Sequence, residues 1–229
     1  MLAFSSLLGN VEGQNIYRIW YDKPASYWEE ALPVGNGRIA AMVFGDPQLE
    51  QIQLNEETVS AGSPYQNYNE EAKTALPEMR RLIFEGKYEE AQNMAATKIL
   101  SQVGNEMPYQ TVGRLNIRYQ DHKKVNNYYR DLDISNAVAV TRYEVDGVEF
   151  TEETFASFTD QLVIRHIKAS KPGTINCELF FNTPMRDPKR SIYGKKGLRL
   201  EGITHGSRYF PGKVHYCADL DVKHKGGKV

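Results

Sequence analysis

The chain has 229 residues, of which 41% are hydrophobic and 25% are charged, and its formal net charge is -1. This is the composition of an ordinary globular protein that buries a sizeable core and does not need disulfide bonds to fold. The charge is balanced and the basic runs are short and scattered, so the composition indicates neither a nucleic-acid-binding surface nor a surface that binds an acidic membrane. Beyond the N-terminus, no segment approaches the ~20 apolar residues of a membrane helix.

The N-terminal stretch is the first recognisable element. Leu2 to Leu8 is apolar and is followed by small and polar residues, which is typical of the end of a secretory leader, although the basic start of a leader is missing. We therefore interpret residues 1–15 as a leader remnant and expect an exported protein, periplasmic or extracellular. An apolar tail without a targeting role is the alternative.

Strand signals dominate the rest of the chain. The clearest is a hairpin over Ala137 to Ser157, in which apolar and polar residues alternate and Asp146-Gly147 supplies a two-residue turn. Further strands are predicted at Tyr17–Tyr21, Arg38–Phe44, Leu49–Leu54, Arg114–Tyr119, Gln161–Lys168, Thr174–Asn182, Leu198–Ile203 and Val214–Val222. Many strands at regular spacing predict a mainly β fold, a large antiparallel β-sandwich.

The glycines near residue 36 have two interpretations. Gly35, Asn36 and Gly37 resemble the small residues of a phosphate-binding loop, but such a loop lies between a strand and a helix. Here the β-branched and apolar run from Ile39 to Phe44 follows instead. The stretch is therefore predicted to be a tight turn that leads into a buried strand.

One helical insertion interrupts the strands at residues 69–101. Asn69 is a suitable N-cap, Pro77 suits the first turn of a second helix, and Gly86 suits a helix end. Apolar residues recur at spacings of three and four, which predicts two or three short helices that pack through these positions.

Candidate catalytic groups are weak at this level. Adjacent glutamates such as Glu152 and Glu153 point to opposite faces of a strand, so they do not form the facing pair that glycoside hydrolysis uses. Glu56 stays open as a functional residue because it follows a strand end beside Asn55. The five histidines show no zinc-binding spacing, so no metal site and no cofactor is predicted.

The two cysteines, Cys177 and Cys217, both fall in strand-like sequence. Cysteine packs as a small hydrophobic residue, so two buried thiols are favoured over a disulfide.

Longer segments carry a resemblance to a known family. They follow one another in consistent order over nearly the whole chain, at Trp20–Pro47, Gln51–Pro64, Tyr68–Gln92, Tyr109–Tyr119 and Tyr128–Ser157. Together they resemble the N-terminal domain of glycoside hydrolase family 95, the α-L-fucosidase-like enzymes. The resemblance implies a β-supersandwich over residues 16–229 that precedes an (α/α) barrel, with inverting hydrolysis of fucosylated glycans carried out by barrel residues.

The resemblance also sets the expected partner. This sequence ends before such a barrel would begin, so no catalytic residue is assigned within it, and the barrel domain of the parent protein is the expected partner. Candidates for contact with that barrel or with substrate are Trp28, Asn36, Arg38, Asn55 and Glu56.

Three alternatives remain. The chain could be a stand-alone carbohydrate-binding module that stacks sugars on Trp20, Trp28, Tyr65 or Tyr68. It could be a purely structural or interaction domain with an apolar docking patch. The parent enzyme could also act on α-L-galactosides.

Overall fold

A computed structural model describes residues 17–62, 67–101, 107–207 and 211–229. The expected leader remnant and Tyr65 lie outside these residues. The chain divides into two compact units, which are described separately below. The first comprises residues 1–56, 113–183 and 221–229, and the second comprises residues 57–112 and 184–220.

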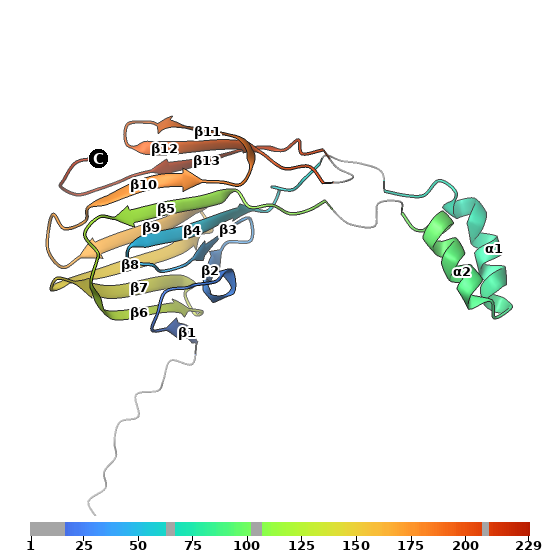
Figure 1. The fold of residues 1–229 in the computed structure, drawn as a ribbon, viewed down its shortest axis with the longest axis horizontal. Helices are drawn as coiled ribbons and strands as arrows, with labels where there is room; N and C mark the ends of the chain where they lie inside the picture. The colour runs from blue at the N-terminus through green and yellow to red at the C-terminus, as the bar shows by residue number, and fades with distance from the viewer. Residues whose placement is uncertain (1–16, 63–66, 102–106, 208–210) are drawn as a thin grey trace, which may run out of the picture. The chain divides into compact units, whose positions relative to one another are not determined.

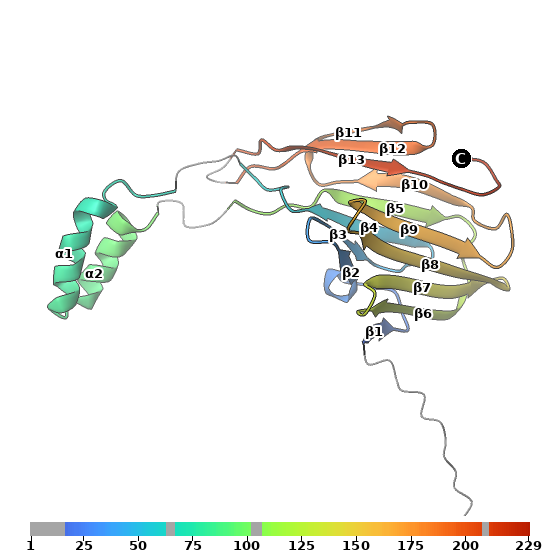
Figure 2. The same cartoon turned by 180° about the vertical axis from the view of Figure 1, so that it is seen from behind.

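The first unit is built from two antiparallel five-stranded sheets that face each other (Figure 1, Figure 2). One sheet has the order β1-β6-β7-β8-β9, with strands Arg18–Tyr21, Val125–Asp133, Val138–Val145, Val148–Ser157 and Leu162–Ala169. The other has the order β10-β5-β4-β3-β2, with strands Cys177–Asn182, Gly113–Tyr119, Leu49–Glu56, Ile39–Val43 and Leu32–Gly35. The predicted antiparallel β-sandwich is confirmed.

Alternating side chains form the core between these sheets. On β7, Ala139, Thr141, Tyr143 and Val145 are all buried, as the alternation in the sequence predicts. The turn to β8 is made by Asp146 and Gly147, whose φ angles are 49° and 71°, so the predicted hairpin is confirmed.

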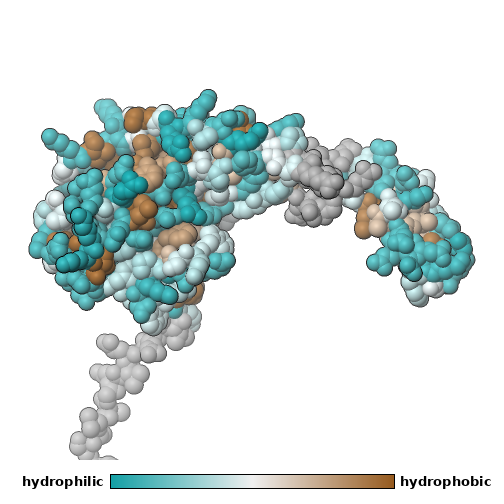
Figure 3. Space-filling model, in the orientation of Figure 1, coloured by the Kyte–Doolittle hydropathy of each residue, from teal (hydrophilic) through white to brown (hydrophobic). Residues whose placement is uncertain are grey.

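The second unit contains the helical insertion and a third sheet. The helices are α1 (Ala72–Phe84) and α2 (Tyr88–Met94), and α2 continues into the π-helical turn η2 (Ala95–Ile99). The sheet is antiparallel where its register is defined and has the order β11-β12-β13, with strands Arg186–Tyr193, Gly197–Ile203 and His215–Asp221. Hydrophilic residues cover most of the face seen in Figure 3, with apolar residues scattered among them.

The helix boundaries differ from the prediction at one point. Pro77 lies inside α1 and does not begin a second helix, so that expectation was wrong. Gly86 ends α1 as predicted: its φ is 76°, its N–H donates to the carbonyl of Ile83, and the N–H of Lys87 donates to the carbonyl of Leu82. This is the Schellman arrangement, in which glycine takes the left-handed conformation at low cost.

Two further expectations need correction. Strands β2, β6 and β11 were not predicted. β2 is only four residues long and contains Pro33, although its burial alternates, with Leu32 and Val34 buried. β11 is exposed along its whole length and shows no alternation of burial. Both cysteines are free, but Cys217 is exposed and Cys177 is only half-buried. The expectation of two buried thiols was therefore wrong.

Candidate functional site

The turn between β2 and β3 is built around the side chain of Asn36. Its Oδ1 accepts hydrogen bonds from the backbone N–H groups of Arg38 (3.1 Å) and Ile39 (2.9 Å), and Gly37 takes a φ of 92°. Its Nδ2 donates to the carbonyl of Ser157 at 2.9 Å, at the end of β8 in the opposite sheet. Asn36 thus shapes the turn and joins the two sheets, as asparagine in such turns is suited to do.

Arg38 projects from this turn beside Glu56. Arg38 Nε lies 3.3 Å from Glu56 Oε1, and about half of the Arg38 side chain is exposed. The register of β3 and β4 pairs Ile39 with Glu56 and Ala40 with Asn55, which places these candidates at one end of the sheet. Asn36, Arg38, Asn55 and Glu56 therefore lie at the same end of the sheet, and Arg38 and Glu56 are in contact. Asn55 and Glu56 are neighbours on β4, so their side chains point to opposite faces.

Trp28 lies apart from the turn. It belongs to the short 3-10 helix η1 (Trp28–Glu30), which precedes β2, and it is 51% exposed. An exposed tryptophan there is suited to a contact with another domain or with a sugar ring, since tryptophan combines a large apolar face with a polar N–H group.

A second polar group lies inside the sandwich. Arg165 Nη2 lies 2.7 Å from Glu50 Oε2 and also contacts Glu152, and none of the three side chains is more than 7% exposed. Glu152 Oε1 accepts hydrogen bonds from the hydroxyls of Tyr119 (2.7 Å) and Tyr143 (2.6 Å). We call these five residues the interior network.

Electrostatics in the interior network follow from its burial. Burial raises the pKa of Glu50 to about 7; the Arg165 guanidinium opposes this shift and the neighbouring Glu152 adds to it. Burial also raises the pKa values of Tyr119 and Tyr143, so both hydroxyls stay protonated and donate. Because its carboxylates are at most 2% exposed, the network is suited to holding the two sheets together and not to binding a substrate.

Comparison with known proteins decides the family. The family model described as glycosyl hydrolase family 65, N-terminal domain, matches residues 19–229. The chain belongs to this family.

Curated relatives of this N-terminal domain are described as fucosidases. "Alpha-L-fucosidase 2" of Arabidopsis thaliana is 37% identical over 181 residues, which are 76% of this chain and 21% of that protein. "Probable alpha-fucosidase A" of Aspergillus niger is 26% identical over 162 residues, 66% of this chain and 20% of that protein. The chain thus spans about a fifth of the length of these two relatives. They support the resemblance to α-L-fucosidase-like enzymes, while the assignment to family 95 stays a proposal.

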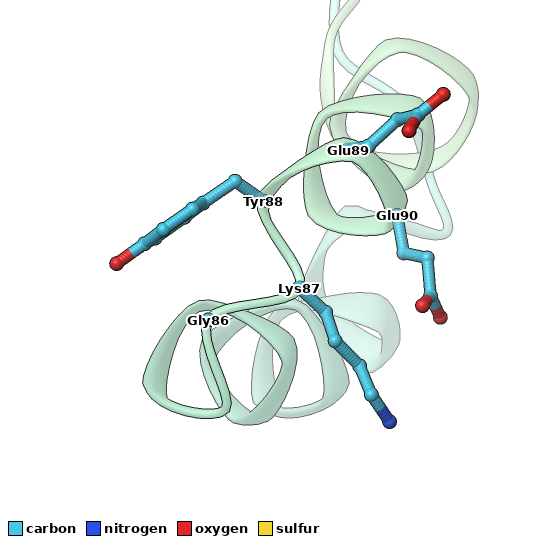
Figure 4. Close-up of a pocket in the computed structure, with 5 residues that line it drawn as sticks. All are labelled: Gly86, Lys87, Tyr88, Glu89 and Glu90. Carbon is cyan, nitrogen blue, oxygen red and sulfur yellow. The ribbon is translucent and has the colours of Figure 1, made fainter.

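The described residues of this N-terminal domain offer little else that resembles a site. Among the described residues, no group of three or more His, Cys, Asp or Glu side chains is placed to hold a metal ion. No helix in the described ranges is long and apolar enough to cross a membrane. A hollow at the turn between α1 and α2 is lined by Gly86 to Glu90, but its side chains diverge: Tyr88 points one way and Lys87 another (Figure 4).

The interior network was not predicted from the sequence. Glu152 and Glu153 point to opposite faces as predicted: Glu152 is 2% exposed, while Glu153 contacts His166 at the surface. The sequence does not show which residues would pair with the buried glutamates. Glu50 and Arg165 are 115 residues apart, and only the packing of the two sheets brings them together. A charged residue at an inward position of an alternating strand is the one sequence clue to such a buried pair.

Proposed function

We propose that this chain is the non-catalytic N-terminal β domain of an α-L-fucosidase-like glycoside hydrolase of family 95. The observation that carries the proposal is the 37% identity to "Alpha-L-fucosidase 2" over 76% of the chain. The family model for the N-terminal domain of glycosyl hydrolase family 65 supports the part of the proposal that makes this chain an N-terminal glycoside hydrolase domain. In this proposal the parent protein hydrolyses fucosylated glycans with inversion, and the catalytic groups come from an (α/α) barrel domain.

The chemistry of the described residues is consistent with an accessory role. Inverting glycosidases hold two carboxyl groups roughly 6.5–9.5 Å apart on either side of a bound sugar, with room for a water molecule. The facing carboxylates of this domain, Glu50 and Glu152, share Arg165 inside the sandwich and are at most 2% exposed. They leave no room for a sugar between them.

The end of the sandwich at the β2–β3 turn is the proposed contact with the barrel. Arg38 is half-exposed there and already pairs with Glu56, so its guanidinium is oriented before any partner arrives. Asn36 fixes the turn that carries it. Asn55 lies at the same end of the sheet, opposite Ala40. Trp28 precedes β2, away from the turn, and is proposed as a separate contact with the barrel or with substrate.

Activity assays test the proposal. Purified protein of 229 residues should release no fucose from 2′-fucosyllactose, whereas a protein that also includes the coding sequence after Val229 should release it. NMR of the first product should show the anomer inverted relative to the substrate. Hydrolysis by the 229-residue protein alone, or no hydrolysis by the longer protein, would overturn the proposal. A 4-nitrophenyl α-L-galactoside run in parallel distinguishes a galactosidase.

Export is a separate proposal, based on the apolar stretch from Leu2 to Leu8. Fractionation of the source cells should place the protein outside the cytoplasm. Recovery in the cytoplasm alone, with residues 1–15 intact, would contradict it.

A further inference from the structure

An aromatic pair stands on the outer face of the β1-β6-β7-β8-β9 sheet. The ring centroids of Trp20 and Tyr129 lie 6.2 Å apart with their planes 21° from parallel, and Trp20 is 61% exposed. In the register, Trp20 is opposite Asp131, two residues beyond Tyr129 on β6, so all three side chains point to one face. That face is directed away from the sandwich core.

A β-bulge sets the direction of Tyr129. The pairing of β6 with β7 shifts between Asn126 and Tyr129, and Asn127 takes a φ of 51°. The result sends Tyr128 inward, where its hydroxyl donates to the carbonyl of Gly45 at 2.6 Å, and leaves Tyr129 on the outer face beside Trp20. Bulges often re-aim a side chain beside a functional site.

Two arginines flank the aromatic pair and are held by a buried carboxylate. Asp131 is only 1% exposed although it points to the outer face; its Oδ2 lies 3.1 Å from Arg18 Nη1 and its Oδ1 lies 3.3 Å from Arg142 Nη1. The side chains of Arg18 and Arg142 are 35% and 47% exposed. Both guanidinium groups are therefore oriented and still reach solvent.

We propose that Trp20, Tyr129, Arg18 and Arg142 form a binding site for a pyranose ring of a neutral glycan. We call these four residues the outer-face site. The C–H face of a pyranose stacks on an indole ring, as apolar faces do, and the guanidinium N–H groups donate to its hydroxyl oxygens. Asp131 and Asp133 balance the charges of the two arginines, since Arg18 Nη2 also lies 3.5 Å from Asp133. This balance favours a neutral sugar over an acidic one.

The site goes beyond the proposed function because it needs no catalytic domain. It would hold a glycan through non-catalytic contacts. Its failure and the failure of the proposed function are distinguishable, since binding is measured on the 229-residue protein and hydrolysis on the longer one.

The two tryptophans of the chain make a direct test possible. In a Trp28→Phe protein Trp20 is the one remaining indole, so its fluorescence reports a sugar stacking on it. Titration with 2′-fucosyllactose should change the emission with a dissociation constant on the order of 1 mM, as expected for a small exposed site. The reciprocal Trp20→Phe protein, which keeps Trp28, should give no change.

Calorimetry on the otherwise unchanged protein provides the second measurement. Trp20→Ala should weaken 2′-fucosyllactose binding about tenfold or more, and Arg142→Gln by a few fold. Tyr88→Ala, which removes a 67% exposed aromatic ring from α2, is the matched control and should bind as the unchanged protein does. Circular dichroism melting checks that each variant is folded.

Three outcomes would overturn the outer-face site. One is the absence of heat and of any Trp20 response up to about 20 mM sugar, well above the expected dissociation constant. Another is binding that a folded Trp20→Ala protein retains in full. The third is tighter binding of the acidic 3′-sialyllactose than of 2′-fucosyllactose, because the balanced charges of the arginines and aspartates would then not describe the site.

Discussion

The Arg165–Glu50 contact inside the sandwich and the Arg38–Glu56 contact at its end join the same two residue types. Their nitrogen–oxygen distances are also similar, 2.7 and 3.3 Å. They differ in burial: Arg165 and Glu50 are 7% and 0% exposed, whereas Arg38 and Glu56 are 52% and 19% exposed. A buried charge destabilises the fold unless an opposite charge lies beside it, whereas water screens exposed charges.

The two contacts have different roles because they differ in burial. Removing one partner of a buried pair leaves a charge that water cannot solvate, so its effect appears in folding stability. Removing one partner at the surface changes stability little and leaves the other side chain available for a new contact. The interior network should therefore respond to mutation through stability, and the β2–β3 turn through binding.

The largest effect is expected from Arg165→Met. The change leaves Glu50 and Glu152 buried without their shared cation and should lower the free energy of unfolding by about 3–5 kcal/mol. Urea denaturation measures this. The matched control is Arg118→Met, which breaks the exposed Arg118–Glu178 pair and should cost less than about 1 kcal/mol. Equal losses in both variants would remove the distinction between the two contacts.

A pH dependence should follow from Glu50. Its pKa is about 7 in the folded chain, against 4.5 as the unshifted value. An acid whose pKa is raised by folding stabilises the fold fully below the unfolded value and loses that contribution as the pH rises through the folded value. Between about pH 4.5 and 7 the unfolding free energy should therefore fall by about 3 kcal/mol on account of Glu50.

Glu50→Gln tests this origin. Glutamine keeps an oxygen for the backbone N–H groups of Phe44 and Gly45 but does not ionise in this range. The difference in unfolding free energy between the unchanged and variant proteins, measured in urea at half-unit pH steps, should carry the slope. Glu178→Gln, at an exposed carboxylate, is the control. A slope that survives in Glu50→Gln would assign the dependence to another group.

Features that depend on local sequence were predictable, whereas contacts between distant segments of the chain were not. The β7–β8 hairpin was predictable because its alternation and its Asp146-Gly147 turn are both local. The tight turn at Gly35 to Gly37 was predictable for the same reason. The partners of its side chains were not, because Asn36 contacts Ser157 and Arg38 contacts Glu56 through strand pairing and sheet packing. The interior network and the outer-face site depend on those same long-range contacts.

A middle-sized effect is expected from Asn36, which is half-buried and belongs to both the turn and the sheet contact. Asn36→Ala removes the acceptor for two backbone N–H groups and the donor to Ser157, and should cost about 1–2 kcal/mol of unfolding free energy. Asn36→Asp keeps the acceptor and loses the donor, so it should cost less. Thermal and urea unfolding of both variants measure the two parts. If both variants lost the same unfolding free energy, the hydrogen bonds within the turn would contribute nothing to stability beyond the contact with Ser157.

The smallest effect on stability is expected from Arg38→Ala. In the 229-residue protein, loss of the exposed pair with Glu56 should change the unfolding free energy by less than about 0.5 kcal/mol. In the longer enzyme the same variant should lower fucosidase activity or weaken docking of the two domains, because the guanidinium that faces the barrel in our proposal is gone. Kinetics and thermal unfolding of the longer protein measure this.

Arg81→Ala is the control for Arg38→Ala, since Arg81 also forms exposed ion pairs, with Glu78 on α1 and with Glu85 at its C-cap, and should leave activity unchanged. Unaltered kinetics and unaltered unfolding of the longer protein carrying Arg38→Ala would exclude Arg38 from the domain contact. The turn would then have only the structural role that Asn36 gives it. A loss of activity or docking in Arg38→Ala but not in Arg81→Ala would instead show that the exposed Arg38–Glu56 pair, which contributes little to folding stability, orients Arg38 for a partner.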